Sequence, residues 1–165
     1  MIEPQPSIGF ATVDDVSELA RLRWELYAEQ EGEPPEPFED YVERFARFAR
    51  PALASEDWRA WAAREDGRLV GAMWLMTVTR VPVPGQPAGP IGYLTNVYVK
   101  PGHRNAGLGA QMLDRVKTWC RESGYSQVIV WPTQRSRPFY GRGGFGRLDE
   151  PLVLVVEPAP GLRHP

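Results

Sequence analysis

The residues best suited to chemistry lie at one glycine-containing turn. Gly107 and Gly109 follow the polar turn Pro101–Ala106, which comes after the apolar run Ile91–Val99. This order predicts a strand, a tight turn and the start of a helix. The first amides of a helix have no intrahelical partner and carry the positive end of its dipole, and glycine removes the Cβ that would hold a phosphate away from the backbone. With the charge of Arg104 beside it, the segment predicts a phosphate or pyrophosphate site.

Two other nucleotide motifs do not fit this spacing. A Walker loop needs Gly-Lys-Ser/Thr after a four-residue gap, and neither Gly107 nor Gly109 is followed by that sequence. A dinucleotide-binding fold has three glycines near the first strand of a βαβ unit, whereas these two glycines come late in the chain. One structural alternative stays open, because glycines at a helix start can serve only close packing of the helix on a sheet.

The elements around this segment predict a mixed sheet with helices on its faces. Alternating and continuous apolar runs indicate strands, apolar residues at helical spacing indicate helices, and glycine and proline mark the turns. Thr12 and Asp15 approximate a capping box at the first helix, and Pro51 is expected to end the second. The expected strands are Ser7–Ala11, Trp58–Arg64, Arg68–Val81, Ile91–Val99, Ser126–Trp131 and Leu152–Glu157; the expected helices begin behind Thr12, near Phe38, at Gly107 (to Ser123) and at Pro138 (to Arg142).

Length and composition favour a single small globular domain. The 165 residues fit one domain, with an ordered core of about 7–157 and a flexible tail over 158–165. The net charge of −2 argues against a nucleic-acid partner. No apolar run approaches the ~20 residues of a membrane span, and the N-terminus lacks the pattern of a signal peptide.

The cysteine and histidine content bears on disulfides, on the cellular compartment and on metal binding. The single Cys120 excludes an internal disulfide and fits a reducing compartment, so we expect a cytoplasmic protein. Its place on the apolar stripe of a predicted helix favours burial over reactivity. With two histidines and no cysteine pair, a metal site is not expected.

Three motifs together closely resemble the GNAT superfamily of N-acetyltransferases. Arg104–Gly109 fits that family's Arg/Gln-x-x-Gly-x-Gly/Ala loop, and Leu94–Val99 with Pro101 fits the strand before it. Pro138–Tyr140 with Gly144-Phe145 resembles the later Tyr-x-x-x-Gly-Phe element. The resemblance implies an α+β fold with a mixed, mostly antiparallel sheet of six to seven strands, flanked by helices and splayed between Ile91–Val99 and Ser126–Trp131.

The resemblance also implies acetyl-CoA as the cofactor. Its pyrophosphate is expected on the amides after the turn, and its pantetheine arm along the last residues of the strand, where one amide would polarise the thioester carbonyl. The family often has Asn seven residues before its tyrosine, and Thr133 stands there instead. The cofactor-binding residues expected on this basis are Val97, Tyr98, Val99, Arg104, Asn105, Ala106, Gly107, Leu108, Gly109, Ala110 and Thr133.

For catalysis, the resemblance assigns Tyr140 as the acid that protonates the departing thiolate, a role that suits a phenol; packing against the CoA arm is the alternative. Glu25 and Glu29 lie where the family places its acceptor wall and are the candidate bases, although both also suit a solvated helix face. The other expected acceptor residues, for which core packing is the alternative, are Trp24, Tyr27, Tyr93, Thr95 and Trp131.

The function implied is acetyl transfer from acetyl-CoA to a primary amine of a small molecule or peptide, by direct attack. A non-catalytic acyl-CoA-binding or regulatory module and a purely structural α/β domain are the alternatives. Homodimerisation is a habit of the family and is consistent with the apolar run Leu152–Val156.

Overall fold

Five strands form one sheet in this computed structural model, which describes residues 5–86 and 89–147. The first three strand pairs are antiparallel and the pair β4–β5 is parallel, so the sheet is mixed and mostly antiparallel, as predicted. The strands lie in chain order: β1 (Ser7–Phe10), β2 (Trp58–Glu65), β3 (Arg68–Val78), β4 (Ile91–Val99) and β5 (Gln127–Val130).

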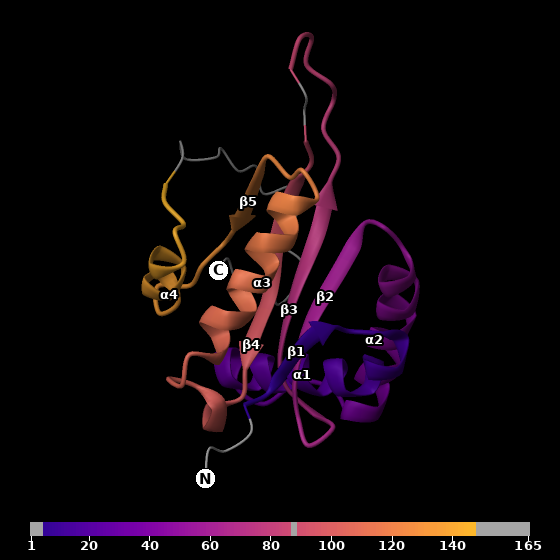
Figure 1. Ribbon diagram of the computed structural model, residues 1–165. Helices are drawn as coiled ribbons and strands as arrows, with labels where there is room; N and C mark the ends of the chain where they lie inside the picture. The colour runs from indigo at the N-terminus through magenta and orange to yellow at the C-terminus, as the bar shows by residue number, and fades with distance from the viewer. Residues whose placement is uncertain (1–4, 87–88, 148–165) are drawn as a thin grey trace. The chain divides into compact units, whose positions relative to one another are not determined.

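The expected number of six to seven strands is therefore wrong for the described residues. The additional strand was predicted over Leu152–Glu157, which lies outside them. The strand β3 ends at Val78 rather than Val81, because the proline-rich stretch begins there and Val81 is almost fully exposed. In Figure 1 the chain after β3 extends well beyond the end of the sheet.

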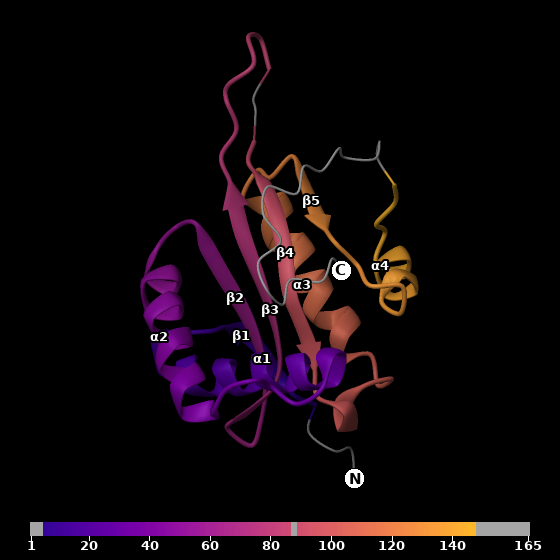
Figure 2. The same ribbon diagram turned by 180° about the vertical axis from the view of Figure 1, so that it is seen from behind.

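Helices cover both faces of the sheet. The helices α1 (Val16–Glu31) and α2 (Phe38–Ala54) lie on one face and α3 (Leu108–Glu122) on the other (Figures 1 and 2). Short 3-10 turns, η1 (Val13–Asp15) and η2 (Pro101–His103), precede α1 and the loop before α3. The arrangement is an α+β fold in which β4 lies between the two helical layers.

The second helix continues past the residue that was expected to end it. Pro51 lies inside α2, which ends at Ala54. A proline within a helix removes one hydrogen bond and costs about 3 kcal/mol. Ala49 and Ala52 on either side of it are buried against the sheet, and this packing offsets the cost.

Bulges in two strands change which side chains share a face. In β3 the register shifts beside Gly71, and glycine within a strand often marks such a bulge. In β4, Asn96 and Val97 together oppose the single residue Met73. Such a two-to-one bulge reverses the alternation of side chains beyond it. Tyr98 therefore points to the same face as Thr95, the face covered by α1 and α2.

The parallel pairing of β4 with β5 covers only the first part of β4. It runs from Ile91 opposite Gln127 to Leu94 opposite Val130. Beyond Leu94, no described residue of β5 pairs with β4, so the edge of β4 that faces away from β3 has no strand beside it. This is the arrangement that the expected splay requires.

Contacts divide the chain into two compact units, Met1–Val130 and Trp131–Pro165. The described part of the second unit holds the helix α4 (Arg137–Arg142). In the described part of the chain, no helix combines the length and apolar character needed to cross a bilayer. These residues also contain no group of three or more His, Cys, Asp or Glu side chains placed to hold a metal ion.

Candidate active site

The start of α3 has the backbone geometry that the two glycines predicted. Gly107 caps the helix at φ +84°, in the left-handed region that glycine adopts without strain. An added Cβ there would meet nothing closer than the side-chain nitrogen Nε2 of Gln111 at 3.9 Å. Gly107 is thus required for its backbone angle, and the space in front of it is open.

The first amides of α3 have no partner within the described residues. The first helical hydrogen bond runs from the Gln111 amide to the Gly107 carbonyl at 3.0 Å, and no side chain caps the helix. The amides of Leu108, Gly109 and Ala110 are therefore available at the positive end of the helix dipole. This observation supports an anion site at the helix start over a purely structural use of the glycines.

The turn before α3 is fixed by the sheet. The Lys100 amide donates to the Val70 carbonyl at 2.9 Å, and η2 closes with a bond from the Arg104 amide to Pro101 at 3.2 Å. Asn105 then adopts φ +64° before Gly107. Asparagine tolerates this region better than most residues, so two left-handed positions aim the chain into α3.

The side chain of Arg104 takes a different position from the one expected. Its two terminal nitrogens donate to both oxygens of Glu29 at 2.8 and 2.6 Å, and its Nε donates to the Val99 carbonyl at 2.8 Å. The Glu29 contact raises the pKa of Arg104 further, so the guanidinium stays charged. The guanidinium thus binds α1 to the end of β4, and its charge is already compensated within the protein.

On the α1 side, the end of β4 carries a connected group of charged and phenolic side chains. Tyr98 is buried beneath Arg104, whose guanidinium carbon lies 5.4 Å from the ring centre. Burial, followed by the charges of Glu25 and Glu29, raises the pKa of Tyr98. Glu25 also lies 3.8 Å from the Lys100 ammonium. Both glutamates predicted as bases are therefore engaged with residues of the protein.

The predicted acceptor residues separate into three groups. Trp24 packs between Phe38 and Tyr41 of α2, which supports a core role for it. Tyr93 and Thr95 lie on the α1–α2 face of β4, and Tyr27 of α1 is, like them, half-buried. Trp131 belongs to the second unit, with 49% of its surface exposed.

The second unit presents Tyr140 on α4. Its ring is buried and packs against Phe139 and Phe145, with centroids 5.0 and 5.5 Å apart. Thr133 is used locally, since its hydroxyl oxygen accepts a hydrogen bond from the Ser136 amide at 3.2 Å ahead of α4. A contact with the pantetheine or adenine part of CoA was expected at Thr133, and its hydroxyl is already bonded within this turn.

Sequence reasoning missed two features. The bulge in β4 is centred on Asn96, at φ +48°, and an asparagine inside an apolar strand was the signal that could have revealed it. His103 belongs to the polar turn Pro101–Ala106, where solvent exposure is the ordinary expectation for a side chain. It is instead half-buried, with Nε2 2.8 Å from the Glu65 carboxylate, a partner 38 residues away that no local pattern shows.

The mixed sheet, the open helix start and the strand edge beside it define the class of protein, the acyl-CoA-dependent acyltransferases. The sequence profile described as "Acetyltransferase (GNAT) family" matches residues 16–145. The chain belongs to the GNAT acetyltransferase family, whose members are acyltransferases that use acetyl-CoA as co-substrate.

Individual relatives agree with this placement. The chain is 33% identical over 88 residues to glucosamine 6-phosphate N-acetyltransferase of Trypanosoma brucei brucei, covering 53% of this chain and 58% of that protein. It is 28% identical over 128 residues to aminoglycoside N(6')-acetyltransferase type 1 of Stenotrophomonas maltophilia, covering 78% and 76% of the two chains. A crystal structure of a predicted acetyltransferase with acetyl-CoA from Clostridium acetobutylicum matches with TM-score 0.78 and 25% identity, over 92% of this chain and 96% of that one.

Proposed function

We propose that this protein transfers an acetyl group from acetyl-CoA to a primary amine by direct attack. The observation that carries the proposal is the set of unpartnered amides at Leu108, Gly109 and Ala110, next to a stretch of β4 without a neighbouring strand within the described residues. An anion and an extended arm are the two parts of CoA that such a surface suits. The family profile runs through both units, which supports one acetyltransferase domain.

The helix start binds the pyrophosphate of CoA in this proposal. Amides that need no reorganisation stabilise the anion, and Gly107 keeps the approach open. The pantetheine arm runs along Val97–Val99 as an added strand would. The Val99 carbonyl is already bonded to Arg104, so we assign the arm mainly to the polar groups of Val97 and Tyr98.

Acetyl-CoA supplies an activated thioester, and the residues of this chain orient it and stabilise its charge. An amide at the Asn96–Val97 bulge donates to the carbonyl oxygen on which negative charge develops. Holding the thioester and the amine in line accounts for most of the rate enhancement. Cys120 is buried and its pKa is raised to about 11, so it remains a thiol and no acetyl-enzyme forms on it.

Tyr140 is the proposed acid that returns a proton to the departing thiolate. The replacement Tyr140→Phe keeps the packing against Phe139 and Phe145 and removes only the hydroxyl. We expect the turnover number to fall by roughly 100-fold or more, with an unchanged Kd for acetyl-CoA and an unchanged Tm. Turnover near that of the wild type on a good acceptor would remove this role.

The acceptor class follows from the two curated relatives. By their names, they act on glucosamine 6-phosphate and on aminoglycosides, both of which carry amines on sugars. We therefore propose an amino sugar as the first class to test, and polyamines, amino acids and peptide N-termini as the next. A reducing, cytoplasmic location remains our prediction from the single thiol, as does a homodimer from the family resemblance.

A two-part experiment tests the proposal. Calorimetry with acetyl-CoA measures cofactor binding, and a thiol assay for free CoA measures turnover on a panel of amines. We expect saturable binding and turnover on at least one amino sugar. Binding without turnover on any amine would favour the regulatory module, which the engagement of Glu25 and Glu29 also fits. Absence of binding would overturn both.

A further inference from the structure

Three basic side chains line a hollow on the α1 face of the first unit. The hollow has a volume of about 410 Å³ and lies between the first half of α1, the start of β3 and the end of β4. Arg21, Arg68 and Lys100 line it, one from each of these segments. The volume falls in the range of small-molecule sites, roughly 300–1,000 Å³.

The negative charge at this hollow does not compensate the cations. Within the described residues, neither Arg21 nor Arg68 forms an ion pair, and Lys100 reaches only Glu25, at 3.8 Å. Glu18 is the one acidic side chain in the lining, and its carboxylate already accepts a hydrogen bond from the Leu69 amide at 2.9 Å. In a protein of net charge −2, this leaves a local positive excess.

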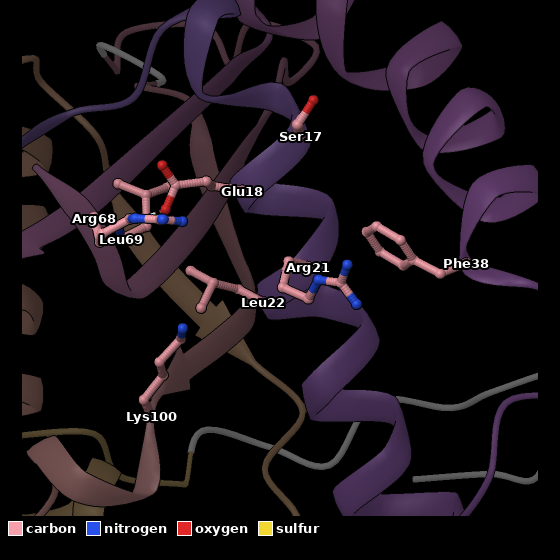
Figure 3. A pocket seen from close by; sticks show the side chains of 8 residues that line it. All are labelled: Ser17, Glu18, Arg21, Leu22, Phe38, Arg68, Leu69 and Lys100. Carbon is pink, nitrogen blue, oxygen red and sulfur yellow. Dashed lines mark hydrogen bonds between the residues drawn. The ribbon is translucent and has the colours of Figure 1, made fainter.

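The remaining walls are apolar and rigid. Leu22 and Leu69 are almost fully buried and form the floor. The guanidinium carbon of Arg21 lies over the Phe38 ring, 3.4 Å from its centre. Figure 3 shows Lys100 and Arg68 reaching from the sheet toward the space beside Leu22, with Arg21 and Phe38 on the far side of α1. The hollow therefore combines positively charged side chains with an apolar floor.

We propose that this hollow binds a small organic anion, with a phosphate monoester or a carboxylate against Arg68 and Lys100 and a carbon body over Leu22 and Leu69. Arginine pairs with both anions through two parallel hydrogen bonds, and lysine adds a point charge. The site is separate from the amides of α3 and does not depend on acetyl transfer.

Amide NMR spectra of the full chain, titrated without CoA, test the site. The probes are phenyl phosphate and benzoate, with phenol as the uncharged control. We expect saturable shifts at Leu22 and Leu69 with one or both anions and none with phenol, and the tighter anion identifies the acid group. The shifts should weaken as salt is raised and persist with saturating acetyl-CoA.

Variants make the test specific. The double replacement Arg68→Gln with Lys100→Gln should raise the Kd of the probe at least about tenfold, whereas Arg47→Gln, an exposed arginine of α2 outside the lining, should leave it unchanged. If the double variant loses its fold, the two single variants replace it. The proposal fails if no saturable shift occurs, if phenol shifts the same amides, if binding survives in the folded variants, or if only Leu108 and Gly109 respond, since the probe would then occupy the helix start of α3.

Discussion

The end of β4 has polar groups on both of its sides, and the two sides differ in whether those groups have partners. We call the α3 side the open side and the α1 side the closed side. On the α3 side, the amides of Leu108, Gly109 and Ala110 have no partner among the described residues. On the α1 side, Glu29 and Arg104 are joined by two short hydrogen bonds, and Glu25 approaches Lys100. One side is open to a ligand, and on the other side the charges are used within the protein.

The difference shows that residue type alone does not identify a site. Charged side chains were the natural candidates for phosphate binding and proton transfer, yet the structure uses Arg104 and Glu29 to hold a helix against a strand. The groups left without a partner among the described residues at the start of α3 are backbone amides, which any residue type except proline can supply. What makes them available is a conformation, and in this chain that conformation depends on Gly107.

The largest effect is expected from Gly107→Val, which breaks the open side. A β-branched residue is strained at φ +84° by about 1–2 kcal/mol, and relief of that strain turns the first amides away. Loss of one or two hydrogen bonds to a charged group should weaken acetyl-CoA binding on the order of 100-fold, measured by calorimetry.

Gly124→Val is the matched control for this replacement. Gly124 follows the other end of α3 and has φ +75°, with no atom near its missing Cβ. It should lose similar stability and keep the affinity for acetyl-CoA. Equal loss of affinity in both variants would mean that the damage comes from unfolding of α3 rather than from the amides.

A smaller effect is expected from Glu29→Gln, which breaks the closed side. Glu29 and Arg104 keep 29% and 25% of their side-chain surface exposed. Ion pairs as exposed as this contribute up to about 1 kcal/mol to the free energy of unfolding. We expect the free energy of unfolding to fall by that amount at most, with the turnover number within about threefold of the wild type.

Urea unfolding and steady-state kinetics measure these two quantities. Glu31→Gln, in an exposed position at the end of the same helix, is the control and should change neither. A hundredfold drop in turnover with loss of the acidic limb of the pH profile would instead make Glu29 the general base.

The smallest effect concerns the stability of the closed side at high pH. Because the pKa of Tyr98 is raised in the folded protein, chiefly by burial, folding favours the neutral phenol. This contribution is complete below about pH 10 and declines as the pH rises through the folded pKa. In Tyr98→Phe, the free energy of unfolding should fall less between pH 8 and pH 10.5 than it does in the wild type. An identical fall in both proteins would contradict a raised pKa of Tyr98 in the folded state.

The elements of the fold were largely predictable, because each depends on neighbours in the sequence. The strand β4 was predicted with its bounds unchanged, and α3 within one residue of each end. The early end of α2 at Pro51 was wrong because tertiary packing outweighed a local rule. The open start of α3 was predictable for the same reason as the elements, since Gly107 and the helix that it starts are adjacent in the chain.

The side-chain partners were not predictable from the sequence. Glu29 and Arg104 are 75 residues apart, and no spacing rule relates a helix end to a loop at that distance. Their pairing follows from how α1 crosses β4, which is a property of the packed sheet. The bulge at Asn96 was missed for a different reason, because regular alternation was assumed along the whole strand.

That bulge makes the facing of the last residues of β4 depend on a backbone conformation. Two residues separate Thr95 from Tyr98, whereas one separates their partners Trp74 and Ala72. If β4 kept all its residues and paired regularly through this point, Tyr98 would turn toward α3 and Val99 would take its place beside Glu25 and Glu29. Deleting Asn96 would instead remove the extra residue and leave Tyr98 opposite Ala72, so a strand shorter by one residue would keep the contents of both layers.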